Sequence, residues 1–143
     1  MLLRLSLALL CSMPMLSYAC SCADRPADLV AAVQEGIVAS SAVVEAEVIA
    51  LKTEKNWQKI TWKVSRNWKG PHAANSYIET RTQIGCCACG KTVEQVPRYL
   101  LYLHGGQPYF ITTCSMSASF PTAAVQVRVL EDLYKPEFAK PDK

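Results

Sequence analysis

The chain has 143 residues, a formal net charge of +3 and an apolar fraction of 50%. This length fits one domain, and the apolar content excludes disordered and low-complexity classes, which bury too little hydrophobic surface to fold. A net charge this small, spread evenly along the chain, predicts no nucleic-acid binding. Seven cysteines indicate an oxidising compartment rather than a reducing cytosol.

The N-terminus is typical of a secretory signal peptide. A short positive start at residues 1–4 precedes an apolar run over residues 5–16, and residues 17–19 (Ser-Tyr-Ala) offer small side chains at the −3 and −1 positions of a cleavage site. The run is too short to span a bilayer, and no later apolar stretch reaches the roughly 18 residues that a spanning helix needs. We therefore expect residues 1–19 to be removed, leaving a secreted or periplasmic protein that begins at Cys20.

A lipid anchor on Cys20 is the alternative, because lipid attachment also requires a cysteine directly after the cleavage site. Lipoprotein signals normally carry an aliphatic residue at −3 and a small residue at −2, whereas this chain has Ser17 and the bulky Tyr18 there. The sequence therefore favours a free α-amino group on Cys20.

Two helices are predicted to flank the domain. The first is expected over Ala27–Glu35, opened by Asp24 and Pro26 and closed by Gly36. The second is expected to start at Pro121 and to run to about Tyr134, followed by a flexible tail at residues 135–143. One face of this second helix is apolar, with Ala123, Val127, Leu130 and Tyr134 at helical spacing.

Between these helices the apolar residues mostly alternate, which predicts β-strands. Five strands are expected: Ala42–Leu51, a strand that starts at Ile60 and ends at Trp68-Lys69-Gly70-Pro71, Tyr77–Thr82, Arg98–Leu103 and Tyr109–Thr113. The Lys52–Asn56 segment is expected to connect the first two strands. The last two are expected to form a hairpin across His104–Pro108, because this segment is rich in turn residues. Five short strands and two helices indicate a small β-barrel with helical flanks.

The sequence contains no enzyme motif of the serine-hydrolase, zinc-protease, phosphate-loop or dinucleotide type. His72 and His104 are expected to face solvent in turns, and Glu45 and Glu47 to form a solvated pair on one strand face. We therefore expect neither catalysis nor a bound cofactor.

Three tryptophans lie on or near one β-arm, at Trp57, Trp62 and Trp68. Exposed aromatic residues on a barrel can bind oligosaccharide or single-stranded nucleic acid. However, Trp62 belongs to the apolar face, and no basic groove accompanies the other two in the sequence. The sequence therefore does not favour a ligand site of this kind.

Loss of residues 1–19 would also remove Cys11 and leave an even set of cysteines, Cys20, Cys22, Cys86, Cys87, Cys89 and Cys114. Such a set in a small exported domain predicts a disulfide framework, whose pairings the count alone leaves open. A bridge between the N-terminal pair and the downstream group closes a long loop and stabilises the fold by roughly 4 kcal/mol. It also fixes a terminus that would otherwise fray, which suggests that the terminus itself has a function.

Several short motifs, in this order, resemble the N-terminal, netrin-like domain of the tissue inhibitors of metalloproteinases, and most of all its short exported bacterial members. They are Cys20-Ser21-Cys22, Trp68-Lys69-Gly70, Cys89-Gly90, Tyr99-Leu100-Leu101-Tyr102 and Cys114-Ser115. The resemblance covers residues 20–134 and implies an all-β fold, a five-stranded Greek-key barrel of the oligonucleotide/oligosaccharide-binding (OB) type, with the two helices flanking it.

The resemblance also implies two disulfides. In the family the first cysteine bonds to the cysteine that precedes a glycine, here Cys20 to Cys89, and the second bonds to the one after the last barrel strands, here Cys22 to Cys114. The family's third bridge has no counterpart, because no cysteine lies between Cys22 and Cys86.

Cys86 and Cys87 therefore stay unassigned. With Cys89 they form Cys-Cys-x-Cys, which could hold a soft metal ion. The alternatives are a vicinal bridge, free thiols, or a regulatory or partner-linked disulfide. Too few further ligands lie nearby in the sequence to favour the metal site.

The resemblance implies an inhibitor that chelates the catalytic zinc of a metalloproteinase through the α-amine and carbonyl oxygen of Cys20. Ser21 would lie at the mouth of the protease specificity pocket, and Cys22 would hold this wedge in place. Flanking contacts would come from the connection after Leu51 and from the Gly85–Gly90 loop. The alternative is a non-inhibitory exported netrin-like module that binds another protein or an envelope component, because a fold alone does not establish a function.

Overall fold

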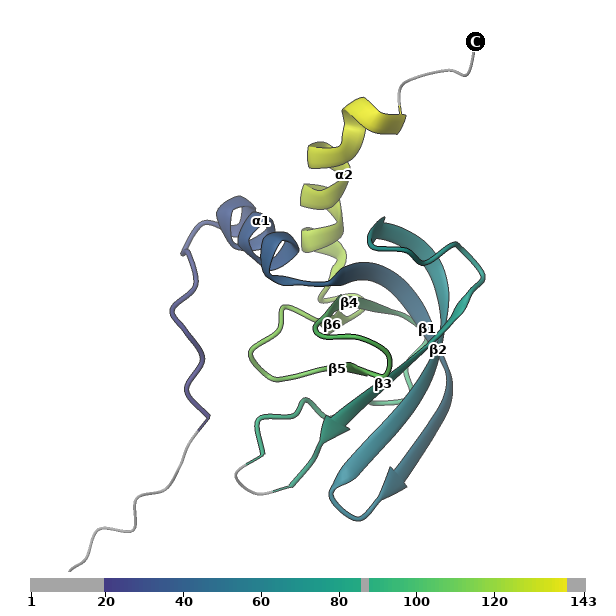
Figure 1. Ribbon diagram of the computed structural model, residues 1–143. Coiled ribbons are helices and arrows are strands. Elements are labelled where there is room, and N and C mark those ends of the chain that lie inside the picture. Colours follow the sequence, from purple (N-terminus) through teal and green to yellow (C-terminus); the bar gives the residue numbers. More distant parts are fainter. Residues whose placement is uncertain (1–19, 86–87, 139–143) are drawn as a thin grey trace, which may run out of the picture.

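The computed structural model describes residues 20–85 and 88–138, which form a curled β-sheet with two helices (Figure 1). The elements are α1 (Leu29–Ala39), β1 (Ala42–Glu54), β2 (Trp57–Lys69), β3 (Tyr77–Gln83), β4 (Tyr99–Leu103), β5 (Tyr109–Phe110), β6 (Ala118–Ser119) and α2 (Ala124–Phe138). The prediction of a mostly β domain with two helices is confirmed. The sheet has six strands where the sequence predicted five, because the short strand β6 was not expected.

The strand order in the sheet is β5-β3-β2-β1-β4-β6. All neighbours are antiparallel except β3 and β5, which pair in parallel through Thr80 with Tyr109 and Arg81 with Phe110. The predicted hairpin between β4 and β5 is therefore wrong as a strand pairing: β4 lies between β1 and β6, and only an isolated bridge between His104 and Phe110 joins the two segments. That bridge links the end of β4 to the far edge of the sheet and curls it into a half-barrel.

Strands β1 and β2 form a long hairpin with a two-residue turn. The residues expected to connect them are mostly strand, since Lys52 pairs with Lys59 and Glu54 with Trp57. Lys55 takes a positive φ of 53° at the turn itself. Irregularities in β1, including one between Val48 and Ala50, shift the pairing along the hairpin.

The sheet buries one hydrophobic cluster inside its curve and a second beneath the helices. The inner cluster contains Trp62, whose indole donates to the Thr80 hydroxyl at 2.7 Å. Because β4 contributes to both clusters, all five of its residues are buried. The helices cover the outer face at β1, β4 and the end of β2 around Trp68, whereas the outer face of β3 and of the paired part of β2 (residues 57–63) stays exposed (Figure 1).

Helix α1 begins and ends later than predicted. The Asp28 carboxylate caps it by accepting from the Ala31 N–H at 2.8 Å, and the helix continues through Gly36, which was expected to end it. A Cβ at Gly36 would lie 3.0 Å from Met116 Sδ and 3.1 Å from Tyr102 Cε1. Gly36 therefore serves close packing of α1 rather than its termination.

Helix α2 packs its predicted apolar face onto the sheet, with Ala123 and Leu130 fully buried and Tyr134 beside Trp68. The expected solvated Glu45–Glu47 pair is wrong for Glu45. This side chain is buried on the face that α2 covers, and its carboxylate lies 4.0 Å from the Arg66 guanidinium.

Candidate functional site

The N-terminal segment is held to the domain by two disulfides. Cys20 is bonded to Cys89 with a Cα–Cα distance of 5.5 Å, and Cys22 to Cys114 with a Cα–Cα distance of 5.2 Å. These are the two pairings that the resemblance implied. They span 69 and 92 residues of sequence, so they attach the segment to parts of the chain that only folding brings together.

The two anchoring cysteines lie on neighbouring segments. The Thr113 N–H and hydroxyl both donate to the Cys89 carbonyl, at 2.9 and 3.2 Å, and Gly90 forms an antiparallel bridge with Thr112. A Cβ at Gly90 would lie 1.7 Å from the Gln83 carbonyl oxygen, so only glycine fits here. Cys89 therefore anchors the N-terminal segment, and Gly90 lets the chain beside it approach the end of β3 closely.

A turn presents Cys114 beside this contact. The Ser115 N–H and hydroxyl donate to the Thr112 carbonyl at 3.1 and 2.9 Å. Two residues further on, the buried Ser117 hydroxyl accepts from the Tyr102 N–H at 2.8 Å and donates to the Tyr102 carbonyl at 3.3 Å. These bonds tie the Cys114 turn to β4, the most buried strand of the sheet.

Arg25 is a positioning residue that no sequence motif indicates. Its guanidinium donates to the Cys114 carbonyl, which adds a polar bond to the covalent anchor at Cys22. A hollow of about 150 Å³ lies here between the N-terminal segment and α1, with Asp24 and Glu35 in its lining. Burial, with a smaller effect of the Arg25 charge, lowers the pKa of Lys91, whose ammonium donates to the Ser117 carbonyl.

The segment itself stays open to solvent. Cys20, Ser21 and Cys22 are exposed, as is every residue from there to Val30. Because both bonds of the segment run through side-chain sulfur, the backbone atoms of Cys20 are left for other contacts. The arrangement is an exposed segment that two disulfides attach to the domain. Among the described residues no three His, Cys, Asp or Glu side chains gather to hold a metal ion.

The other residues considered from the sequence lie elsewhere. His72 and His104 are partly buried rather than solvent-facing: His72 Nε2 lies 2.7 Å from the Tyr109 hydroxyl, and His104 Nδ1 lies 3.2 Å from the Ala39 carbonyl. Burial lowers the pKa of His72. Cys86 and Cys87 lie outside the described residues, so the predictions for their state stay predictions.

Within residues 20–85 and 88–138, no helix is both long and apolar enough to cross a membrane. No protein-family model matches the chain. A search of curated proteins finds no match either.

Proposed function

We propose that the protein is a secreted inhibitor of zinc metalloproteinases, related to the tissue inhibitors, whose N-terminal Cys20 chelates the zinc of the target. The observation that carries the proposal is the N-terminal segment itself, in which both cysteines of Cys20-Ser21-Cys22 are bonded to adjacent, hydrogen-bonded segments while all three residues stay exposed. A terminus held this firmly and left uncovered is suited to contact another molecule.

The chemistry follows from the open coordination position of a catalytic zinc ion, which water or substrate normally fills. The α-amine and carbonyl oxygen of an N-terminal Cys20 form a five-membered chelate ring with such an ion and displace that water. The amine must be neutral to bind, and an ordinary α-amino pKa near 8 makes deprotonation inexpensive at neutral pH. Inhibition is therefore expected to strengthen as pH rises toward that pKa.

Rigidity favours this mode of binding. Two disulfides and the Arg25 bond to Cys114 fix the segment before it meets a protease, so little ordering entropy is lost on docking. Ser21, small and polar, would enter the mouth of the specificity pocket. The tip of the β1–β2 hairpin would supply flanking contacts, together with the 85–90 loop.

We further propose that the curled sheet is a variant of the five-stranded Greek-key barrel of the OB type. Its support is the long β1–β2 hairpin and the His104–Phe110 bridge, which joins the two ends of the strand order β5-β3-β2-β1-β4. Strand β6 then extends the barrel at its β4 side.

The deciding experiment compares the protein beginning at Cys20 with a form carrying one added alanine before it. The addition turns the α-amine into an amide and leaves both disulfides in place. Residual activity of a panel of zinc proteases measures the inhibition, which is expected to fall by roughly a hundredfold or more because no rim contact replaces the chelate. Ser21→Gly is the matched control and is expected to change the preference among proteases without abolishing inhibition.

Equal potency of the two forms would rule out chelation by Cys20. Inhibition by neither form would favour the alternative, a non-inhibitory exported module that binds another protein or an envelope component. A lipid or acetyl group on Cys20, detected by intact mass, would also exclude the chelate.

A further inference from the structure

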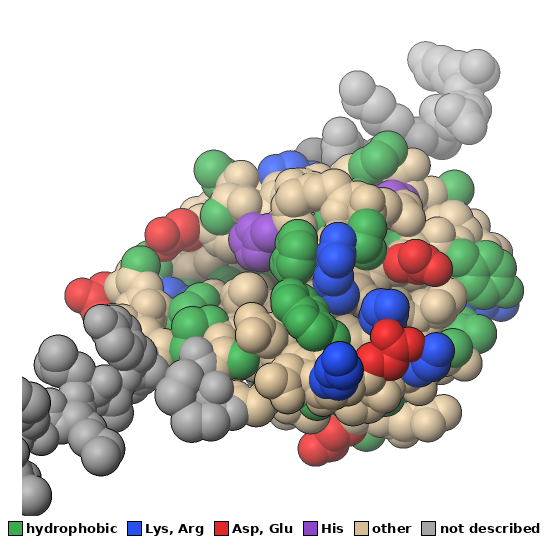
Figure 2. All heavy atoms as spheres, turned by 60° about the horizontal axis from the view of Figure 1, so that its bottom comes forward, with side chains coloured by type: hydrophobic (Ala, Val, Ile, Leu, Met, Phe, Trp, Pro, Cys, Tyr) green, Lys and Arg blue, Asp and Glu red, His purple; other side chains and the backbone are tan. Residues whose placement is uncertain are grey.

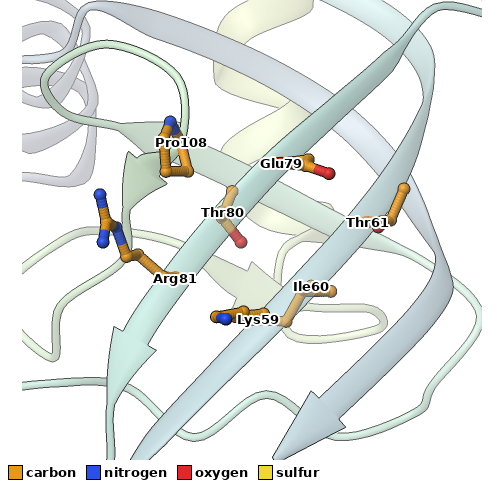
Figure 3. Close-up of a pocket in the computed structure, with 7 residues that line it drawn as sticks. All are labelled: Lys59, Ile60, Thr61, Glu79, Thr80, Arg81 and Pro108. Carbon is orange, nitrogen blue, oxygen red and sulfur yellow. The ribbon is translucent and has the colours of Figure 1, made fainter.

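The second half of β1 is paired on one side only. Strand β4 pairs with β1 over Ala42–Ala46, whereas β2 pairs with β1 as far as Glu54. Residues 47–54 of β1 therefore form an open edge of the described sheet. The edge of β3 differs, because β5 pairs with it and Pro108 lies beside this contact (Figure 3).

Backbone groups point out of this open edge at Val48. In an antiparallel pair, residues that bond to the partner strand alternate with residues that bond away from it. The Val64 N–H donates to the Ser76 carbonyl at 2.9 Å, and the Val64 carbonyl accepts from the Asn75 N–H at 2.7 Å, so Val64 bonds away from β1. Its partner Ala46, and Val48 two residues further along, therefore direct their backbone groups away from β2.

Leu51 directs its backbone groups out of the same edge. Glu54 and Trp57 flank the two-residue turn as a bonded pair, and the alternation then makes Leu51 a residue that bonds away from β2. One extra residue between Val48 and Ala50 forms a bulge, which explains why Val48 and Leu51 point the same way although they are three residues apart. Within residues 20–85 and 88–138, no loop backbone group bonds to either residue.

The open edge carries opposite charges around an apolar centre. Glu47 and Lys52 are exposed, and the four residues between them are all apolar, with Ile49 49% exposed. No basic group of the described residues lies within ion-pair distance of the Glu47 carboxylate. Open edges of monomeric proteins usually carry a charge or a proline that prevents pairing. Here the charges lie only at the two ends of the stretch, and they have opposite signs.

We propose that residues 47–52 of β1 pair with the same residues of a second copy, which joins two molecules into a dimer through a continuous antiparallel sheet. A two-fold axis between Ile49 and Ala50 places Val48 opposite Leu51 of the second copy, where their outward backbone groups bond to each other. The same register places Glu47 opposite Lys52 of the second copy. Two-fold symmetry repeats both contacts, and the bulge does not disturb the register because both strands contain it.

Two observations favour a second copy over an unrelated extended peptide. The charge pattern is complementary to itself, because an antiparallel copy presents a lysine to each glutamate and an apolar residue to each apolar residue. Figure 2 shows acidic and basic side chains interspersed on one face of the molecule, so no large area of one charge there repels another copy. The open edge and the N-terminal segment lie on opposite sides of the view in Figure 1, so the dimer does not depend on protease inhibition.

The experiment measures self-association of the purified, disulfide-bonded protein by sedimentation velocity over a series of concentrations. We expect a dimer that dissociates on dilution, because a single strand pair is a small interface. Ile49→Lys is expected to weaken dimerisation by roughly tenfold or more, because it brings two like charges together at the two-fold axis. Val38→Lys is the matched control, because Val38 is an 80% exposed aliphatic residue on α1. This variant is expected to dimerise as the unchanged protein does.

A charge reversal tests the register. Glu47→Lys or Lys52→Glu alone places like charges opposite each other twice and is expected to weaken dimerisation by roughly tenfold. The double variant Glu47→Lys/Lys52→Glu restores opposite charges and is expected to recover most of the affinity. Thermal midpoints at low concentration check that each monomer folds, because Glu47 also lies opposite Lys63 of its own chain.

Amide hydrogen exchange identifies the interface directly. Exchange at Val48 and Leu51 is expected to slow as the protein concentration rises, because their N–H groups become bonded in the dimer. A protein that stays monomeric at the highest soluble concentration would overturn the proposal. So would a dimer that Ile49→Lys leaves intact, or one that forms without a change in exchange at Val48 and Leu51. A double reversal that recovers no affinity would overturn the register.

Discussion

The N-terminal segment and the outer face of the β-arm are both exposed, but they are held in place in different ways. The N-terminal segment makes no strand or helix up to Asp28, and two disulfides fix it to the Cys89 and Cys114 segments. A basic row on this face, Lys52, Lys59 and Arg81 on β1, β2 and β3, needs no covalent bond, because the backbone ladders of the three strands set its geometry. One region is positioned by side-chain chemistry and the other by strand register.

This difference predicts opposite responses to mutation. Removing an anchor of the N-terminal segment should cost stability, since the segment buries almost nothing that would hold it otherwise. Removing the charge of Arg81 should cost none, because Arg81 lies directly opposite Lys59 and the two like charges repel each other. The following predictions test that contrast in order of expected effect.

The largest effect is expected from removing the second disulfide with Cys22→Ser/Cys114→Ser. The bridge closes a loop of 92 residues, so its loss should lower the free energy of unfolding by about 4–5 kcal/mol. Denaturant unfolding at fixed pH measures the change.

Peptide mapping without reductant should recover Cys20 linked to Cys89 and Cys22 linked to Cys114, and a Cys20–Cys22 or Cys20–Cys86 link would contradict this arrangement.

A smaller loss is expected for Gly90→Ala. The added Cβ would meet the backbone of Gln83 and force the Cys89 segment away from β3, at a cost of roughly 1–3 kcal/mol. Gly106→Ala is the control, because nothing lies within 4 Å of a Cβ there. Thermal unfolding of both variants measures the difference. Equal midpoints would mean that the Cys89 segment adapts freely and that the N-terminal segment is less firmly placed than the geometry indicates.

The two regions also differ in how far the sequence predicts them. Cys20-Ser21-Cys22 is a local motif that can be recognised in the sequence. Its disulfide partners lie in two further local motifs, Cys89-Gly90 and Cys114-Ser115, so the resemblance could imply the pairing. Lys52, Lys59 and Arg81 have no local signal, because their alignment depends on the two-residue turn between β1 and β2 and on the pairing of β2 with β3. A one-residue slip would place these side chains on opposite faces.

The helix and strand errors have similar causes. Gly36 is a common helix terminator, but the packing of α1 against Tyr102 and Met116, which the sequence does not reveal, uses it inside the helix. The turn-rich segment before β5 is typical of a hairpin, yet both edges of β4 are taken by β1 and β6. Periodicity predicts which residues are buried more reliably than which strands are neighbours.

A slight gain in stability is expected for Arg81→Gln. Loss of the guanidinium removes its repulsion with Lys59, which should raise the free energy of unfolding by roughly 0.2–1 kcal/mol, the usual size of a cross-strand pair contribution. High salt should shrink the gain, because Lys59 is exposed and Arg81 is only partly buried. Lys63→Gln, which removes a charge opposite Glu47, is expected to give no gain. Thermal midpoints at low and high salt compare the two variants, and a clear destabilisation by Arg81→Gln would show that the row supports the fold.

The smallest expected effect is on the pH dependence of stability, at the contact between His72 and Tyr109 of β5. Burial keeps the pKa of His72 below its ordinary value of 6.5, and the ring lies 2.7 Å from the Tyr109 hydroxyl. The unfolded chain therefore binds the proton more readily, so the stability from this group is present above pH 6.5 and is lost as pH falls through the lowered pKa of the folded state. His72→Gln should therefore make the denaturation midpoint fall less steeply between neutral and mildly acidic pH, which denaturant unfolding at a series of pH values measures. If the variant keeps the same pH dependence as the unchanged protein, protonation of His72 does not weaken its contact with Tyr109, and the backbone pairing alone holds β5 beside β3.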